Sequence, residues 1–126
     1  DPGAPIAVEF EALLKVFFAD LGTKQQLLDQ IGTIEEYATR ETAREVRFFR
    51  EYVETGGPFP ERLHIIGLTV GWLVRLNEAV SDWAEWAKTE VDTWEDVSSH
   101  PDDRSLFQQL LEEKKANLQD HTLGQV

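Results

Sequence analysis

The chain has 126 residues without a single cysteine, and its 12 basic and 24 acidic residues give a formal net charge of -12. This length suits one domain with its own core, while the lack of cysteine excludes disulfides and thiolate chemistry. The negative charge opposes binding to nucleic-acid phosphates and anionic membranes, and no uncharged run approaches the ~20 residues that span a bilayer. We expect a single all-α domain in the cytoplasm, without a cofactor or membrane association.

A first helix is expected over residues 8–21, after a proline-rich linker over residues 1–7. Its apolar residues recur at the spacing of one wide helix face: Phe10, Leu13, Leu14, Phe17, Phe18 and Leu21. A helix this short needs neighbours that cover its apolar face. Because the chain contains no methionine, we expect the natural N-terminus to lie further upstream. An expression product trimmed at its start is the alternative.

A second helix is expected over residues 24–55. Thr23 and Gln26 have the capping-box spacing at its start, and the Gly-Gly-Pro run at 56–58 ends it. Both ends of this helix are apolar, whereas residues 39–45 are almost wholly polar. This polar stretch either projects into solvent or spans a gap between two packed regions. Its arginines belong either to a solvated face or to a docking surface for an acidic partner. Three arginines follow one another there at steps of four and three: Arg40, Arg44 and Arg47.

A third helix is expected over residues 59–97, antiparallel to the second because the turn between them is short. It carries a first apolar stripe with heptad spacing, which we call the seam: Phe59, Leu63, Ile66, Val70, Leu73, Asn77, Val80, Ala84, Ala87, Val91 and Trp94. The second stripe is Ile65, Leu68, Trp72, Leu76, Ala79, Trp83 and Trp86. A helix with two apolar faces is buried among several neighbours, so we expect one neighbour to come from a second copy of the chain. Asn77 either fixes the register of a helix pair or faces solvent.

A last helix is expected over residues 101–117, where a loop leads into a proline and two acids. Its apolar stripe consists of Leu106, Phe107, Leu110 and Leu111. Lys114 and Lys115 lie near its end, and we expect the residues after about 117 to be frayed. The sequence leaves open whether this helix crosses to another subunit or folds back on its own.

Patterns that carry catalysis or bind metal are scarce. Glu61 and His64 form one E-x-x-H pair, whereas a di-iron bundle needs two such pairs and two further carboxylates. No phosphate-binding glycine loop, zinc-protease motif or serine-nucleophile motif occurs. We therefore predict no catalytic residue, no metal site and no enzyme. A carboxylate-rich helical bundle that holds a metal is the enzyme alternative.

The tryptophans are the better candidates for a ligand site. Trp72, Trp83, Trp86 and Trp94 all fall on the third helix, and flat aromatic side chains suit a pocket for planar apolar ligands. Large aromatic residues at helical spacing also serve as core or as subunit interface. Both interpretations stay open, because a pocket can form where two subunits meet.

The run from Phe10 to Asp20, with Leu-Leu-Lys-Val-Phe-Phe-Ala-Asp as its most specific part, is followed by a long polar-centred helix and a longer one ending in Trp83-x-x-Trp86. This order resembles the C-terminal domain of PadR-like transcriptional regulators over roughly residues 8–97; the last helix lies outside the resemblance. In that family an N-terminal winged helix-turn-helix binds operator DNA and the helical C-terminal domain dimerises. Some members repress until a small aromatic or other effector binds. The winged helix is missing from this chain, so DNA binding is expected only through that missing domain.

The resemblance implies a homodimer whose interface includes Phe17 and Phe18 on the first helix and Val70, Leu73, Asn77, Val80 and Trp83 on the third. We expect an antiparallel hairpin of long helices, with a short N-terminal and a C-terminal helix, in a dimeric helical bundle. The expected function is dimerisation and effector sensing in a PadR-like regulator, with a small aromatic molecule as candidate effector. The alternative is a free-standing helical adaptor that binds another protein through its apolar stripe, and it predicts a monomer.

Overall fold

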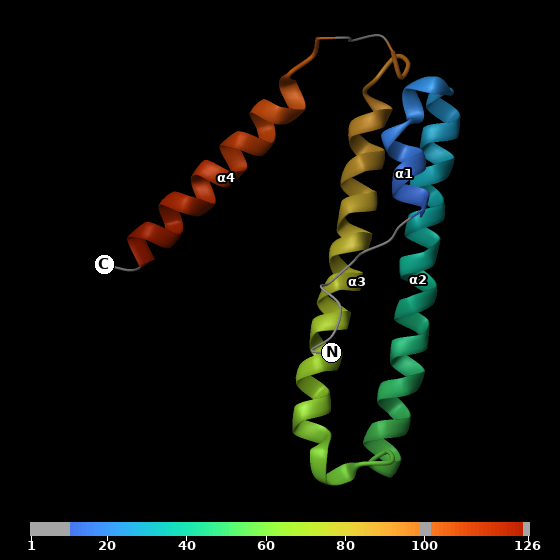
Figure 1. Cartoon of the computed structure of the whole chain (residues 1–126), viewed down its shortest axis with the longest axis vertical. Helices are drawn as coiled ribbons and strands as arrows, with labels where there is room; N and C mark the ends of the chain where they lie inside the picture. The colour runs from blue at the N-terminus through green and yellow to red at the C-terminus, as the bar shows by residue number, and fades with distance from the viewer. Residues whose placement is uncertain (1–10, 99–101, 125–126) are drawn as a thin grey trace, which may run out of the picture.

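The computed structural model describes residues 11–98 and 102–124 of the chain (Figure 1). Every regular element in these ranges is helical, which confirms the predicted all-α class. None of these helices combines the length and the hydropathy needed to cross a bilayer.

Two long helices form the body of the structure. In chain order the elements are α1 (Glu11–Phe17), the 3-10 helix η1 (Ala19–Leu21), α2 (Lys24–Thr55), the 3-10 helix η2 (Pro60–Arg62), α3 (Leu63–Asp92) and α4 (Ser105–Gly124). α2 and α3 lie side by side and run in opposite directions, and α1 packs beside them at the end away from their connecting turn (Figure 1). α4 extends away from the other three helices (Figure 1).

Local sequence signals set both ends of α2. The predicted capping box is confirmed: the Thr23 side chain accepts a hydrogen bond from Gln26 N, and the Gln26 side chain accepts one from Thr23 N. At the other end Gly56 adopts the left-handed conformation with φ of 78°, and its N–H donates to Tyr52 O. Glycine is favoured at this position because a Cβ disfavours positive φ.

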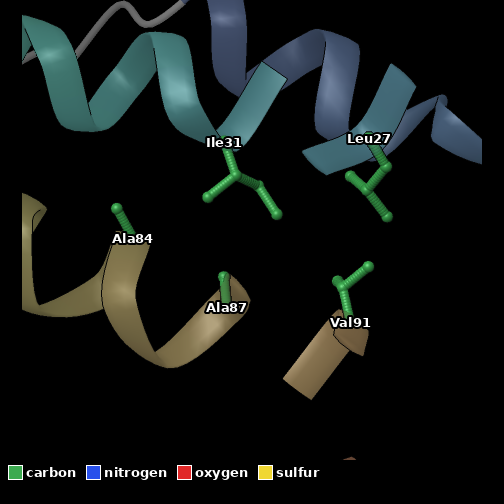
Figure 2. Close-up of a cluster of buried hydrophobic side chains, with 5 residues drawn as sticks. All are labelled: Leu27, Ile31, Ala84, Ala87 and Val91. Atoms are coloured by element: carbon green, nitrogen blue, oxygen red, sulfur yellow. The ribbon is translucent and has the colours of Figure 1, made fainter. Parts of the chain in front are cut away.

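The buried core lies between α2 and α3, near the end where α1 packs. Its fully buried cluster consists of Leu27, Ile31, Ala84, Ala87 and Val91 (Figure 2). Ile31 of α2 lies opposite the small Ala84 and Ala87 of α3, so the two backbones approach closely there, and Leu27 lies opposite Val91. The three members from α3 all belong to the seam, so this end of the seam is covered by α2 of the same chain.

Asn77 sets the register of α2 against α3 within one chain. Its Nδ2 donates to Ala38 O at 3.1 Å and to Thr42 Oγ1 at 2.9 Å. Of the two interpretations left open by the sequence, the structure therefore shows register fixing, and it does so inside the chain. Lys88 and Glu35 add an ion pair of 3.1 Å between the same two helices.

Three predicted helix boundaries differ from the observed ones. The helix expected over residues 8–21 is α1 followed by η1, because the chain turns at Phe18; residues 8–10 lie outside the described residues. The helix expected over 59–97 opens with the 3-10 turn η2 and its α-helical part ends at Asp92. Lys24 Nζ donates to Asp92 O at 3.3 Å and to Trp94 O at 2.8 Å, which satisfies carbonyls that a continuing helix would have bonded itself.

The last helix is also displaced relative to the prediction. It was expected over residues 101–117, but α4 begins at Ser105, whose N–H donates to Asp103 Oδ1 at 2.9 Å. This carboxylate satisfies one of the orphan donors at the start of the helix. α4 then continues to Gly124, seven residues beyond the expected end at 117. Residue 101 lies outside the described residues.

Candidate functional site

In the half of α3 nearer the turn, its own chain leaves apolar side chains of both stripes exposed, including Leu63 (36%) and Leu73 (50%) of the seam. Leu68 is 74% exposed, Trp72 48% and Ile65 45%, all in the half of α3 nearer the turn. In the other half, Trp83 and Trp86 are half-buried because they pack against the core cluster. Exposed apolar side chains of this size, gathered in one region, are typical of surfaces that contact another molecule.

α1 carries a second exposed apolar surface. Phe17 is 77% exposed, Leu14 62% and Phe18 55%. The rings of Phe17 and Phe18 meet edge to face, with centroids 5.0 Å apart. This is a favourable aromatic geometry, but it leaves the outer faces of both rings in solvent. One side of α1 therefore packs on α2 while large apolar side chains remain uncovered.

The residues predicted for a dimer interface fall into two groups. Phe17, Phe18 and Leu73 are exposed, so a second chain can contact them directly. The other four are partly buried within the chain: Val70, Asn77 and Val80 line a groove between α2 and α3, and Trp83 packs on the core cluster. The spacing of the seam could not show which of these residues contact α2 and which remain exposed. Packing against α2 and packing against a second chain both require the same apolar periodicity.

Three of the four tryptophans meet at one cavity of about 460 Å³ beside α1. Trp83, Trp86 and Trp94 line it together with Phe17, and η1 and the start of α2 also contribute. The fourth, Trp72, lies outside this cavity and is half exposed near the other end of α3. Of the four tryptophans predicted to form a pocket, three therefore line the same cavity. We refer to this space as the tryptophan cavity.

The polar groups of the tryptophan cavity are few. Asp20 and Glu90 belong to its lining, and Trp94 Nε1 donates to Glu90 Oε1 at 3.4 Å. Aromatic and aliphatic side chains form the rest of the wall. A volume in the range of ligand sites, with flat apolar walls and a few polar groups, suits a planar aromatic molecule that carries a hydrogen-bond donor.

A second hollow, which we call the α2–α3 groove, lies nearer the turn and was missed by the sequence reasoning. Its volume is about 450 Å³, and the polar middle of α2 forms one wall while the seam of α3 forms the other. The available signal was the polar stretch at 39–45 opposite the largely apolar seam: burying charged side chains against apolar ones is costly, so the space beside the seam is not closely filled. Its lining is Tyr37, Glu41, Arg44, Glu45, Phe48, Phe49, Val70, Leu73, Leu76, Asn77 and Val80.

Within the described residues, no group of three or more histidine, aspartate or glutamate side chains is arranged to hold a metal ion. His64 and Glu61 are both exposed on the turn side of the molecule. Comparisons with family descriptions, with curated proteins and with solved structures find no match to this chain.

Proposed function

We propose that this chain is the dimerisation and effector-sensing domain of a PadR-like transcriptional regulator. The observation that carries the proposal is the apolar surface that one chain leaves open on two helices, at Phe17 and Phe18 of α1 and at Leu68 and Trp72 of α3. A second copy that covers these side chains would remove them from water, which contributes about 25 cal/mol for each Å² of apolar surface buried.

The proposed mechanism links the tryptophan cavity to the dimer interface through α1. Phe17 lines the cavity and is also 77% exposed on the surface assigned to the dimer. A ligand that enters the cavity would therefore act on the helix that a second copy contacts. In the intact regulator the dimer would hold two DNA-reading modules about one helical turn of DNA apart, ~34 Å. An effector would change DNA affinity only by its differential affinity for the two dimer geometries.

The dimer is tested by sedimentation velocity over a hundredfold range of protein concentration. We expect a dimer for the natural sequence and a shift towards monomer for Phe17→Glu and Leu68→Glu. Both side chains are largely exposed in the single chain, so glutamate costs the folded monomer little. Val53→Glu is the matched control, because Val53 is 85% exposed but lies near the turn on α2, outside the proposed interface.

A well-folded monomer at all concentrations would contradict the dimer. It would place the adaptor alternative first, with the same exposed surface serving a different protein. Loss of helical circular dichroism in Phe17→Glu or Leu68→Glu would show unfolding, and an unfolded variant would not count for the dimer.

The ligand site is tested with an uncharged aromatic probe that carries an N–H donor, N-phenyl-1-naphthylamine, by tryptophan quenching and by probe fluorescence. We expect Trp86→Ala to weaken probe binding at least about tenfold, since it removes a wall of the cavity. Trp72→Ala is the matched control and should leave binding unchanged, because Trp72 lies outside the cavity. Equal effects of the two substitutions would refute the assignment. For the regulator itself, ligands that bind must also change operator affinity in the full-length protein.

A further inference from the structure

The α2–α3 groove holds a carboxylate without a counter-charge. Glu45 is half-buried and lines the groove opposite Val70 and Leu73, and its side chain has no hydrogen bond or ion pair among the described residues. The neighbouring carboxylate differs, since Glu41 Oε1 accepts a hydrogen bond from Arg44 Nη1 at 3.0 Å. A half-buried carboxylate without a partner is free to accept charge-assisted hydrogen bonds from a cation brought to it.

The α2–α3 groove lies next to α1, further along the same pair of helices. Leu13 of α1, Ile34 of α2 and Val80 of α3 surround one small apolar cavity, and Val80 lines the α2–α3 groove as well. The groove therefore begins where the cover provided by α1 ends. A second amphipathic helix that packs along α2 and α3 would fill the α2–α3 groove, as α1 covers the same two helices at their other end.

α4 is a helix with an uncovered apolar stripe of matching kind. Phe107 is 78% exposed, Leu118 67% and Leu111 57%, and beyond Leu106 at its start α4 packs on none of the other helices in the described part of the chain. At 100° per residue, Lys114 lies in the middle of this stripe, one turn before Leu118 and two turns after Phe107. Its Nζ has no hydrogen bond or ion pair among the described residues, whereas Lys115 is paired with Glu112.

The apolar stripe of α4 contains one unpaired positive charge, and the partly apolar groove contains one unpaired negative charge, so the two surfaces are complementary. We infer that α4 of one chain occupies the α2–α3 groove of a second chain, with Lys114 against Glu45 of the partner subunit. The inference rests on the proposed dimer and adds to it a helix exchanged between the two copies. The pair would also fix the register of α4 in the groove, which apolar contacts alone leave free to slip.

Lys114 cannot reach Glu45 of its own chain. Leu106 lies beside Trp94 and Val97, which places the start of α4 at the end of α3. From Leu106 to Lys114 a helix advances only about 12 Å. From Trp94 back to the level of Glu45 the distance along α3 is about 30 Å, counting through the bond between Asn77 and Thr42. The remaining gap is too long for the two side chains to meet, so the occupant is a second copy.

Cross-linking between two chains tests the placement, and the natural sequence lacks cysteine, which keeps the background clean. A tagged Glu45→Cys chain and an untagged Lys114→Cys chain are mixed, refolded together and treated with a short bismaleimide. We expect a cross-linked heterodimer of the two different chains. Glu112→Cys replaces Lys114→Cys as the matched control, because Glu112 lies on the opposite side of α4, and it should give at most a tenth of the product.

Charge reversal tests the ion pair itself in the full chain. Glu45→Lys and Lys114→Glu should each raise the dissociation constant of the dimer at least about fivefold, and the double reversal should return it to within about twofold. Lys115→Glu is the control and should change it less than about twofold, since Lys115 lies beside the stripe.

Each outcome decides between the two proposals. A dimer that does not give the specific cross-link contradicts the exchange of α4 but not the dimer. The same holds if the effects of the two charge reversals on the dissociation constant are additive. A cross-link formed inside a single chain of the double cysteine variant shows that α4 folds back, and this also overturns the exchange. A monomer at every concentration overturns the exchange and the proposed dimer together.

Discussion

Two lysines connect α2 to α3, and their different acceptors predict different contributions to stability. Lys24 donates to the backbone carbonyls of Asp92 and Trp94, where α3 ends. Lys88 forms an ion pair with Glu35, and both of these side chains are more than a third exposed, at 42% and 37%. Replacing each lysine by methionine removes the charge and keeps most of the aliphatic stem, so Lys24→Met and Lys88→Met form a matched pair.

The Lys24 substitution should cost about three times as much as the Lys88 substitution. A hydrogen bond from a charged donor contributes ~1.5–3 kcal/mol, and a cation at a helix C-terminus adds ~0.3–1 kcal/mol. Because Lys24 is only half-buried and one of its two bonds is long, at 3.3 Å, we take the lower end, about 1.5 kcal/mol. An exposed ion pair such as that of Lys88 contributes about 0.5 kcal/mol.

Thermal unfolding followed by circular dichroism measures the difference. At about 2.1 cal/mol/K per residue, 126 residues have an unfolding entropy near 0.26 kcal/mol/K, so we expect Tm to fall by about 6 °C for Lys24→Met and about 2 °C for Lys88→Met. Protein concentration must be held fixed, since association raises Tm. In 0.5 M salt the Lys88 effect should shrink further, because salt screens exposed ion pairs. Equal shifts for the two variants would refute the assigned role of Lys24.

Other substitutions test the packing, the turn and the register. Ile31→Ala should destabilise the fold by about 3 kcal/mol in urea unfolding, since Ile31 is 1% exposed and leaves a cavity; a loss below about 1 kcal/mol would contradict its place in the core. Gly57→Ala should cost about 1–2 kcal/mol, because φ is 65° and a Cβ would lie 2.5 Å from the Tyr52 ring. Gly32→Ala, with no atom within 4 Å of the added Cβ, should instead stabilise by about 0.5–1 kcal/mol, and a loss there would refute the assigned environment. Asn77→Ala should cost about 1–2 kcal/mol by removing two hydrogen bonds to α2, and hydrogen exchange should then rise on both helices near that level.

Helix type and helix ends were predictable wherever the signal lies within one turn of the chain. The capping box at Thr23 and the stop at Gly56 are contacts between residues at most four positions apart, so spacing alone identifies them. The end of α3 was not predictable in this way. Carbonyls at this end accept hydrogen bonds from Lys24, which is 68 positions from Asp92, and the spacing of residues 92–97 does not identify that donor.

The candidate site was predictable only in part for the same reason. The sequence identified the tryptophans, but their periodicity along α3 is equally that of a core and of a pocket. Trp72 and Trp83 lie on the same stripe, yet only Trp83 reaches the tryptophan cavity, because α1 covers that half of α3 and leaves the other half open. The α2–α3 groove depends on two segments far apart in the chain, and its shape appears only when they are packed together.

The sequence by itself therefore determined the all-α class, the caps of α2 and the existence of two apolar stripes on one long helix, since each is written in residues within a few turns of one another. The tertiary structure decided which stripe its own chain covers. Ile31 of α2 packs on the small Ala84 and Ala87 of the seam and Leu27 packs opposite Val91, and this close fit turns the second stripe towards α1 at one end and towards solvent at the other. That choice rests on the volumes of side chains brought together from distant positions, which periodicity along one helix does not encode.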